Sequence, residues 1–205
     1  MSKANIQWFP GHMHKAHKQI QEVLPQVDII IEVVDARIPY SSENPLIAAI
    51  RKKTPCIKVL NKADLADPEI TARWIEYLEQ DQDVKAIAIT TSKPEQVHQI
   101  TKLCEKMLPN RLGQDKQIRA MIMGIPNVGK STIINILADR IIAKTGNEPA
   151  VTKNQQRIRL PSGIMLSDTP GFLWPKIENA NSGYRLAVTG AIIDTAIEYE
   201  DIAYY

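Results

Sequence analysis

The sequence predicts an α/β protein with a doubly wound, mostly parallel sheet, and three features of its 205 residues lead to this prediction. First, short apolar runs recur along the chain, as is typical of parallel strands that are buried on both faces. Second, longer amphipathic segments separate these runs, as expected for crossover helices. Third, one pair of short runs is joined by a tight turn, which predicts a single hairpin in an otherwise parallel sheet.

The expected elements follow one another in a regular order. The four parallel strands are predicted over Asp28–Val34, Cys56–Leu60, Val84–Ile89 and Ile118–Met123. The helices are predicted over Glu43–Lys53, Pro68–Gln80, Pro94–Met107 and Gly129–Ala138. The second helix has a favourable start, because Asp67 can cap it and a proline fits its first position. The hairpin is predicted over Arg157–Leu160 and Ile164–Ser167, joined by Pro161-Ser162-Gly163.

The composition is that of a globular protein. Hydrophobic residues make up 44% and charged residues 23%, which excludes a disordered, collagen-like or coiled-coil chain. Cys56 and Cys104 lack CxxC spacing, so they indicate a reducing compartment rather than a disulfide framework. No apolar run reaches the roughly 18 residues of a membrane span, and the N-terminus lacks an apolar signal region. We therefore expect a cytoplasmic protein with no membrane partner.

Charge is distributed unevenly although the net charge is only +2. The first 21 residues contain three lysines and three histidines but no acidic residue. We therefore expect residues 1–25 to form a basic N-terminal segment and residues 26–205 to form the α/β domain. A second stretch, Arg140–Arg159, holds five basic residues and one acidic residue. Each basic stretch is either a solvated face or a surface that contacts phosphate groups.

A phosphate-binding loop is the clearest motif. Gly124–Ser131 matches GxxxxGK[ST] and lies between a predicted strand and a predicted helix, as this motif requires. Its backbone N–H groups can approach phosphate oxygens, Lys130 can neutralise the β- and γ-phosphates, and Ser131 can bind Mg²⁺. The nucleotide contacts expected from this loop and the following turn come from Asn127, Val128, Gly129, Lys130, Ser131 and Thr132.

A second motif, Asp168-Thr169-Pro170-Gly171, follows the second hairpin strand. Asp168 can hold Mg²⁺ through water, and the N–H of Gly171 can contact a γ-phosphate. This segment would then respond to hydrolysis of the nucleotide. The pattern is weak alone, but its place after a strand of the same sheet as the phosphate-binding loop favours the functional interpretation.

A third motif, Asn61-Lys62-Ala63-Asp64, predicts recognition of guanine. The Asp64 carboxylate can accept hydrogen bonds from N1–H and the exocyclic amine of guanine, which adenine does not offer. Asn61 can support the purine edge, and the Lys62 stem can cover the ring. A base that leaves a buried carboxylate unpaired is rejected strongly. Further backbone support for the base is expected from Thr90 and Thr91, which follow another strand.

The order of these motifs is unusual, because base recognition precedes the phosphate-binding loop. This is the order of circularly permuted GTPases of the P-loop fold, which is feasible because the termini of such sheets often lie close together. Together with Trp8-Phe9-Pro10-Gly11-His12-Met13 and Asp168–Pro175, it makes the chain resemble the ribosome biogenesis GTPase A (YlqF) family. The resemblance covers nearly all of residues 5–205.

The resemblance implies roles for further residues. Thr152 matches a threonine that closes on Mg²⁺ in the GTP state, which would complete a Mg²⁺ site with Ser131 and Asp168. Asn127 matches an asparagine that holds K⁺, which would place positive charge near the reacting phosphates. Phe172 occupies the place of a water-orienting glutamine, and the resemblance assigns that task to His12. The expected catalytic residues are therefore His12, Lys130 and Thr152.

Other interpretations of the N-terminal histidines stay open. His12, His14 and His17 lie within six residues of one another. They could hold zinc, although no cysteine cluster or HExxH spacing supports that role, or they could be incidental on a surface helix. The whole basic segment could also contact RNA.

The resemblance implies a GTP-hydrolysing factor that assembles the large (50S) ribosomal subunit, with GTP and GDP, Mg²⁺ and K⁺ as ligands. Its partners would be the rRNA and proteins of the subunit precursor, with no DNA partner, and hydrolysis would be slow until the subunit stimulates it. Family members continue into a helical RNA-binding domain, which is expected to be absent from these 205 residues. The alternative is a GTP-binding module that acts as a slow timer on a protein partner.

Overall fold

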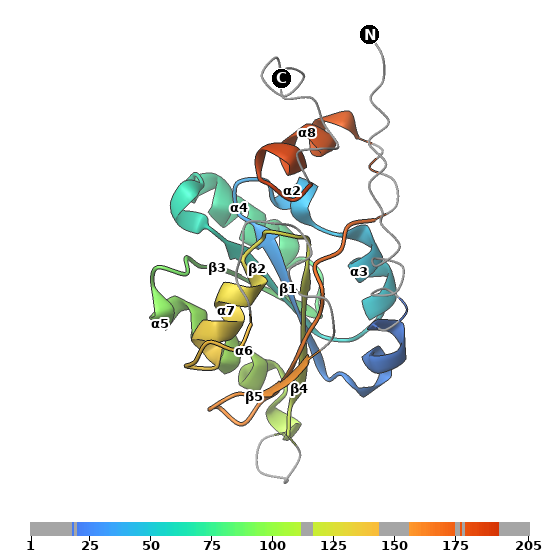
Figure 1. Ribbon diagram of the computed structural model, residues 1–205, viewed down its shortest axis with the longest axis vertical. Helices are drawn as coiled ribbons and strands as arrows, with labels where there is room; N and C mark the ends of the chain where they lie inside the picture. The colour runs from blue at the N-terminus through green and yellow to red at the C-terminus, as the bar shows by residue number, and fades with distance from the viewer. Residues whose placement is uncertain are drawn as a thin grey trace.

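The computed structural model describes residue 18 and residues 20–111, 117–143, 156–174, 177 and 179–192. These residues contain a six-stranded sheet with the order β3-β2-β1-β4-β6-β5 (Figure 1). The strands are β1 (Ile29–Asp35), β2 (Cys56–Asn61), β3 (Val84–Ala88), β4 (Arg119–Gly124), β5 (Gln156–Arg159) and β6 (Met165–Asp168).

Five of the six strands run parallel, and β5 pairs with β6 in the antiparallel direction. The chain builds outward from β1 to β3 and then returns to place β4 on the other side of β1. Strand order reverses at β1 and β4, and ligands of open α/β sheets bind at such a reversal, beyond the carboxyl ends of the strands. The predicted doubly wound sheet with one hairpin is therefore confirmed.

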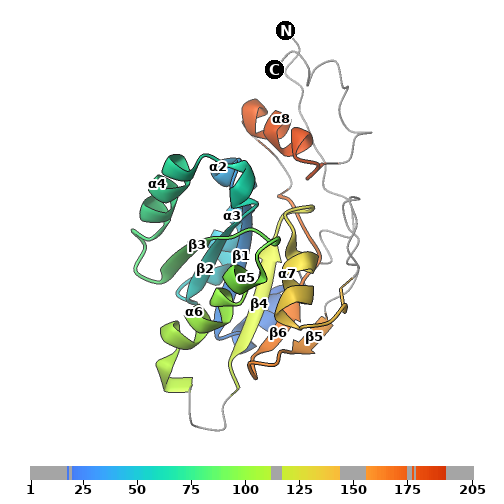
Figure 2. The ribbon, with the colours of Figure 1, turned by 90° about the vertical axis from the view of Figure 1, so that its left-hand side faces the viewer.

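Helices cover both faces of the sheet. The helices are α2 (Pro39–Ser42), α3 (Pro45–Arg51), α4 (Pro68–Leu78), α5 (Pro94–Val97), α6 (Gln99–Met107), α7 (Lys130–Leu137) and α8 (Ala180–Val188). Short 3₁₀ turns are η1 (Leu24–Gln26), η2 (Ala63–Leu65) and η3 (Pro109–Arg111). Helices α6 and α7 lie in front of the sheet in Figure 2, and α3 lies on the opposite side of the strands in Figure 1.

The main core lies between the sheet and these helices. Strands β1, β2 and β4 contribute mostly buried aliphatic side chains, and α6 and α7 contribute Ile100, Cys104, Ile133 and Leu137. A smaller cluster forms where Trp74 and Ile75 of α4 pack against Val34 and Leu60. Among the described residues, no helix has both the length and the apolar content that crossing a bilayer requires.

Two helical predictions differ from the structure, and one helix was missed. The helix predicted over Glu43–Lys53 is wrong in its start, because α2 ends at Ser42 and Asn44 caps a separate helix beginning at Pro45. The helix predicted over Pro94–Met107 is interrupted at His98. Helix α8 was not predicted at all. The division into residues 1–25 and 26–205 stays a prediction.

Candidate functional site

The three sequence motifs meet at the edge of the sheet where β1, β2, β4 and β6 end. The phosphate-binding loop follows β4, and Lys130 is the first residue of α7. Asn61 is the last residue of β2, and Asp168 is the last residue of β6. Parallel strands that point the same way bring their following loops to one edge, so the predicted nucleotide-binding residues gather there although they are far apart in the sequence.

Two glycines make the loop possible. Gly129 has a φ of +100°, and a Cβ placed on it would lie 2.2 Å from Nδ2 of Asn61. Gly124 has a φ of +149°, and a Cβ there would lie 2.4 Å from the carbonyl oxygen of Val33. Both positions therefore require glycine, because a side chain would be strained and would also clash. The loop therefore packs tightly against the Val33 backbone of β1 and the Asn61 side chain of β2.

Lys130 is folded into the loop. Its Nζ donates to the carbonyl oxygens of Gly124 at 3.1 Å and Ile125 at 2.8 Å. Burial lowers the pKa of Lys130 to about 8, and the nearby Asp168 carboxylate only partly opposes that shift. A buried ammonium held by neutral carbonyl groups is poorly compensated. A bound phosphate group would supply the missing counter-charge.

Asp168 is equally under-compensated. It is buried, and its Oδ1 has no hydrogen-bond partner among the described residues. Burial raises the pKa of Asp168 to about 6, against the opposing charge of Lys130. An orphaned buried carboxylate is suited to a cation or to a water bound to one, so Asp168 fits the predicted Mg²⁺ site. Ser131, in the first turn of α7, is the other predicted ligand within the described residues.

The segment after Asp168 packs directly against the loop. The Thr169 hydroxyl donates to the carbonyl of Ile122 at 2.8 Å. A Cβ placed on Gly171 would lie 3.0 Å from both the Lys130 ammonium and the backbone of Pro126. Gly171 therefore lies against both the lysine and the backbone of the phosphate-binding loop.

The base-recognition motif is hydrogen-bonded to the same loop. Asn61 donates from Nδ2 to the Val128 carbonyl at 2.8 Å, and Lys62 donates from Nζ to the Asn127 carbonyl at 3.0 Å. Asp64 is exposed to solvent. Two hydrogen bonds thus fix the position of the motif that would bind the base relative to the loop that would bind phosphate.

Sequence reasoning missed a carboxylate that holds Lys62. Asp35, at the end of β1, accepts a hydrogen bond from the Lys62 ammonium at 2.9 Å. It also accepts from Nε and Nη2 of Arg37 at 2.9 and 2.7 Å. Burial acts to raise the pKa of Asp35, but the hydrogen bonds from Arg37 and Lys62 outweigh it and keep that pKa below its usual range. Asp35 and Arg37, two opposite charges at the end of an apolar run, are the sequence feature that could have indicated this site.

Thr90 and Thr91 lie beside the base-recognition motif, as predicted, because Ala63 donates its backbone N–H to the Ile89 carbonyl at 3.1 Å. The Thr90 side chain is engaged locally, since its hydroxyl lies 2.9 Å from the Ser92 hydroxyl. The Thr90 backbone is engaged as well, since its N–H donates to Oε1 of Gln96 at 3.0 Å and its carbonyl accepts from the N–H of Lys93 at 3.1 Å. Backbone support of the base by Thr90 and Thr91 stays a prediction. Thr132, the remaining predicted contact, is half-buried in the first turn of α7.

Asn127 and Phe172 each connect the site to a neighbouring segment. Asn127 has a φ of +56°, and its Nδ2 donates to the Gly190 carbonyl, just after α8, at 2.7 Å. Phe172 is fully buried in the core, so its side chain cannot reach a water near the phosphates. His12 and Thr152, two of the predicted catalytic residues, lie outside the described residues.

Comparisons with known proteins agree with this geometry. Residues 119–200 match the family described as "50S ribosome-binding GTPase". Ribosome biogenesis GTPase A of Priestia megaterium is 48% identical over 208 residues, which cover 98% of this chain and 72% of that protein. The structure of GNP-bound YlqF from T. maritima superposes with a TM-score of 0.67 at 30% identity, covering 93% of this chain and 72% of that one. The GDP-bound structure of the same protein gives a TM-score of 0.64 at 30% identity, over 90% of this chain and 70% of that one.

Proposed function

The chain belongs to the ribosome biogenesis GTPase A family, so it is a GTP-hydrolysing enzyme involved in ribosome biogenesis, and we propose that it acts as a nucleotide-dependent switch in maturation of the large (50S) subunit. GTP would order the segments around Thr152 and Gly171, and hydrolysis would release them. Its partner would be the rRNA and proteins of the subunit precursor, and it would work in the cytoplasm, where that partner is assembled.

The observation that carries the nucleotide assignment is the direct bonding between the two motifs. Asn61 and Lys62 both donate to carbonyl groups of the phosphate-binding loop. One ligand with a base at one end and phosphates at the other can therefore contact both. We assign Asp64 to the guanine edge, Lys130 to the phosphates, and Gly171 to the γ-phosphate.

The ion sites are part of the same proposal. Ser131, Asp168 and Thr152 would hold Mg²⁺, which neutralises the phosphate oxygens when bound. The orphaned Oδ1 of Asp168 supports this assignment. Asn127 would contribute to a K⁺ site beside the phosphates. His12 would orient the attacking water, because Phe172 is buried and its side chain has no polar atom for that task.

Exchange of the base-reading carboxylate tests the nucleotide assignment. In Asp64→Asn the amide presents an N–H where the carboxylate accepted one, so preference should shift from guanine to xanthine nucleotides. Dissociation constants for GDP and xanthosine diphosphate would be measured for wild type and variant. Asp67→Asn, an exposed carboxylate that caps α4, is the matched control and should keep the guanine preference. If Asp64→Asn still prefers guanine, the assigned base pocket is wrong.

Binding to purified 50S precursors tests the ribosomal part. A switch should bind them more tightly with a non-hydrolysable GTP analogue than with GDP. The alternative, a GTP-binding module that times the action of a protein partner, predicts no nucleotide-dependent binding to the subunit. Sedimentation of the protein with and without precursors, in each nucleotide, separates the two.

A further inference from the structure

Asn44 is a buried polar residue between α2 and α3 that the three motifs do not include. It is fully buried, and its backbone N–H, its amide oxygen and its amide nitrogen each bond to a different residue. Its Oδ1 accepts from the N–H of Leu46 at 3.0 Å, which caps α3. Its Nδ2 donates to the carbonyl oxygen of Phe172 at 2.9 Å, across 128 residues of sequence. Asn44 thus joins the start of α3 to the segment that follows the Asp168–Gly171 motif.

A buried ion pair fixes the backbone of Asn44. The N–H of Asn44 donates to Oε1 of Glu32 at 3.2 Å. The other carboxylate oxygen of Glu32 lies 2.6 Å from the Lys58 ammonium, which also lies 2.6 Å from a carboxylate oxygen of Glu43. Glu32 and Lys58 face each other on the adjacent parallel strands β1 and β2. Asn44 is therefore anchored to the buried interior of the sheet.

The other end of the bond is held equally firmly. The N–H of Phe172 donates to the Gly124 carbonyl, at the start of the phosphate-binding loop, at 3.4 Å. Its ring is fully buried in the core, and its carbonyl is held by Asn44. The N–H, ring and C=O of Phe172 thus have three separate anchors. These contacts place Gly171, which precedes Phe172, beside the Lys130 ammonium.

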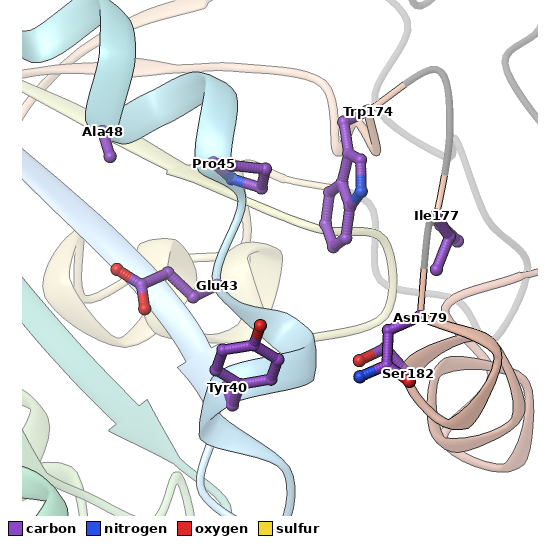
Figure 3. A pocket seen from close by; sticks show the side chains of 8 residues that line it. All are labelled: Tyr40, Glu43, Pro45, Ala48, Trp174, Ile177, Asn179 and Ser182. Atoms are coloured by element: carbon purple, nitrogen blue, oxygen red, sulfur yellow. The ribbon is translucent and has the colours of Figure 1, made fainter.

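A pocket of about 420 Å³ lies between the two segments that this bond connects (Figure 3). Tyr40, Glu43 and Pro45 lie on the side of α2 and α3, and Trp174 and Ile177 lie on the side of the segment after Phe172. A second link between the sides is the hydrogen bond from Ser41 to Ser182 of α8, at 3.1 Å. The hydrogen bond from Asn44 to Phe172 therefore joins two segments that are separated at the pocket.

We propose that Asn44 is a positioning residue for GTP hydrolysis: by holding the Phe172 carbonyl, it keeps the N–H of Gly171 where it contacts the γ-phosphate. This inference rests on the proposed role of Gly171. In this proposal, the ion pair between Glu32 and Lys58 keeps Asn44 in place through the hydrogen bond from the Asn44 N–H to Glu32. GDP has no γ-phosphate, so loss of Asn44 should affect GTP and not GDP.

The test is Asn44→Ser. Serine caps helices about as well as asparagine, so α3 keeps its cap, but the shorter side chain cannot reach Phe172. The loss of one hydrogen bond to a group that must stay fixed should lower kcat for GTP by about tenfold and weaken a non-hydrolysable GTP analogue by about five- to tenfold. The Kd for GDP should stay within about twofold of wild type, because GDP does not use Gly171.

Asn179→Ser is the matched control. Asn179 caps α8 by accepting from the Asn181 N–H at 3.0 Å, so the chemical change is the same at a helix that does not hold Phe172. Its kcat and both affinities should equal those of wild type. Asn44→Thr fills nearly the volume of the asparagine and also caps, so it covers the case in which the serine variant folds poorly. The threonine variant should show the same selective loss.

The results separate three cases. Asn44 variants that keep wild-type kcat and GTP-analogue affinity refute the positioning role. Variants that lose GDP and GTP-analogue affinity equally also refute it, because that pattern indicates a general structural defect. A wild-type protein that binds no guanine nucleotide would instead overturn the proposed function, whatever the variants do.

Discussion

Replacing Phe172 with glutamine is the most direct test of how this enzyme positions its attacking water. The substitution restores the residue type that orients water in many GTPases, so a comparison of motifs alone predicts faster hydrolysis. The structure predicts the opposite. Phe172 is fully buried, and its backbone is held by Gly124 and Asn44, so a glutamine there would enter the core and not the phosphate site.

The size of the effect follows from the burial. Losing a fully buried aromatic side chain removes about 1.5–3 kcal/mol of transfer free energy. Burying an amide without partners costs about 1–3 kcal/mol more. The free energy of unfolding should therefore fall by about 2.5–6 kcal/mol, out of roughly 5–15 kcal/mol for a typical domain. At about 2–4 °C per kcal/mol for a chain of this size, the melting temperature should fall by about 5–24 °C.

Thermal unfolding and GTP turnover, measured at a temperature where the variant is folded, provide the assay. Phe172→Leu is the control, because it also shortens the buried side chain but buries no unpartnered amide, so it should destabilise the protein less than Phe172→Gln and leave turnover unchanged. A Phe172→Gln protein that melts near wild type and hydrolyses GTP faster would refute the argument, since residue 172 would then reach the phosphate site.

Three further predictions concern the ion, the N-terminal histidine and the cysteines. If Asn127 contributes to a K⁺ site, GTP turnover in KCl should exceed that in NaCl at equal ionic strength, and equal rates would remove the potassium assignment. His12→Ala should lower subunit-stimulated kcat by about 10²-fold, the usual loss for a positioned general base, with little change in the Kd for GTP. Full stimulated turnover in this variant would mean that His12 is an incidental surface histidine. Burial raises the pKa of both Cys56 and Cys104 to about 12, so a thiol reagent should not label the folded protein at pH 9. The free energy of unfolding should fall as the pH rises above 9, because only the thiols of the unfolded chain then ionise. Labelling at the same rate with and without denaturant would contradict the burial of these thiols.

The sheet could be predicted because each of its strands leaves a local signal. Runs such as Ile29–Asp35 and Cys56–Asn61 are buried along their whole length, so their sequences are apolar enough to be recognised without knowledge of the neighbours. The same holds for the phosphate-binding loop, since Gly124 and Gly129 meet steric demands that only glycine satisfies. Both features depend on the residue types of a short segment, so they can be recognised in the sequence without knowledge of the tertiary contacts.

The helices beside the site were harder to predict, because their limits depend on tertiary contacts. Asn44 caps α3 shortly after α2 ends at Ser42, and the partners that keep it there, Glu32 and Phe172, are distant in sequence. Helix α8 has only nine residues and contains Asn181, Ser182 and Gly183, which are poor helix formers. The break at His98 has no adjacent proline or glycine to indicate it. Asp35 was missed for a related reason, since its pairing with Lys62 exists only once β1 and β2 lie side by side.

The order of the motifs along the chain has a structural consequence of its own. Contacts between the base-recognition motif and the phosphate-binding loop span 65 and 67 residues, and they depend only on β2 and β4 ending at the same edge of the sheet. The site is therefore indifferent to which motif comes first. What does depend on order is the segment that follows Gly171, because here it leads to α8, and the Gly190 carbonyl beyond α8 accepts from Asn127 of the phosphate-binding loop. The two ends of this segment are therefore both bonded to the phosphate-binding loop, through the Phe172 N–H on the Gly124 carbonyl and through Asn127 on the Gly190 carbonyl.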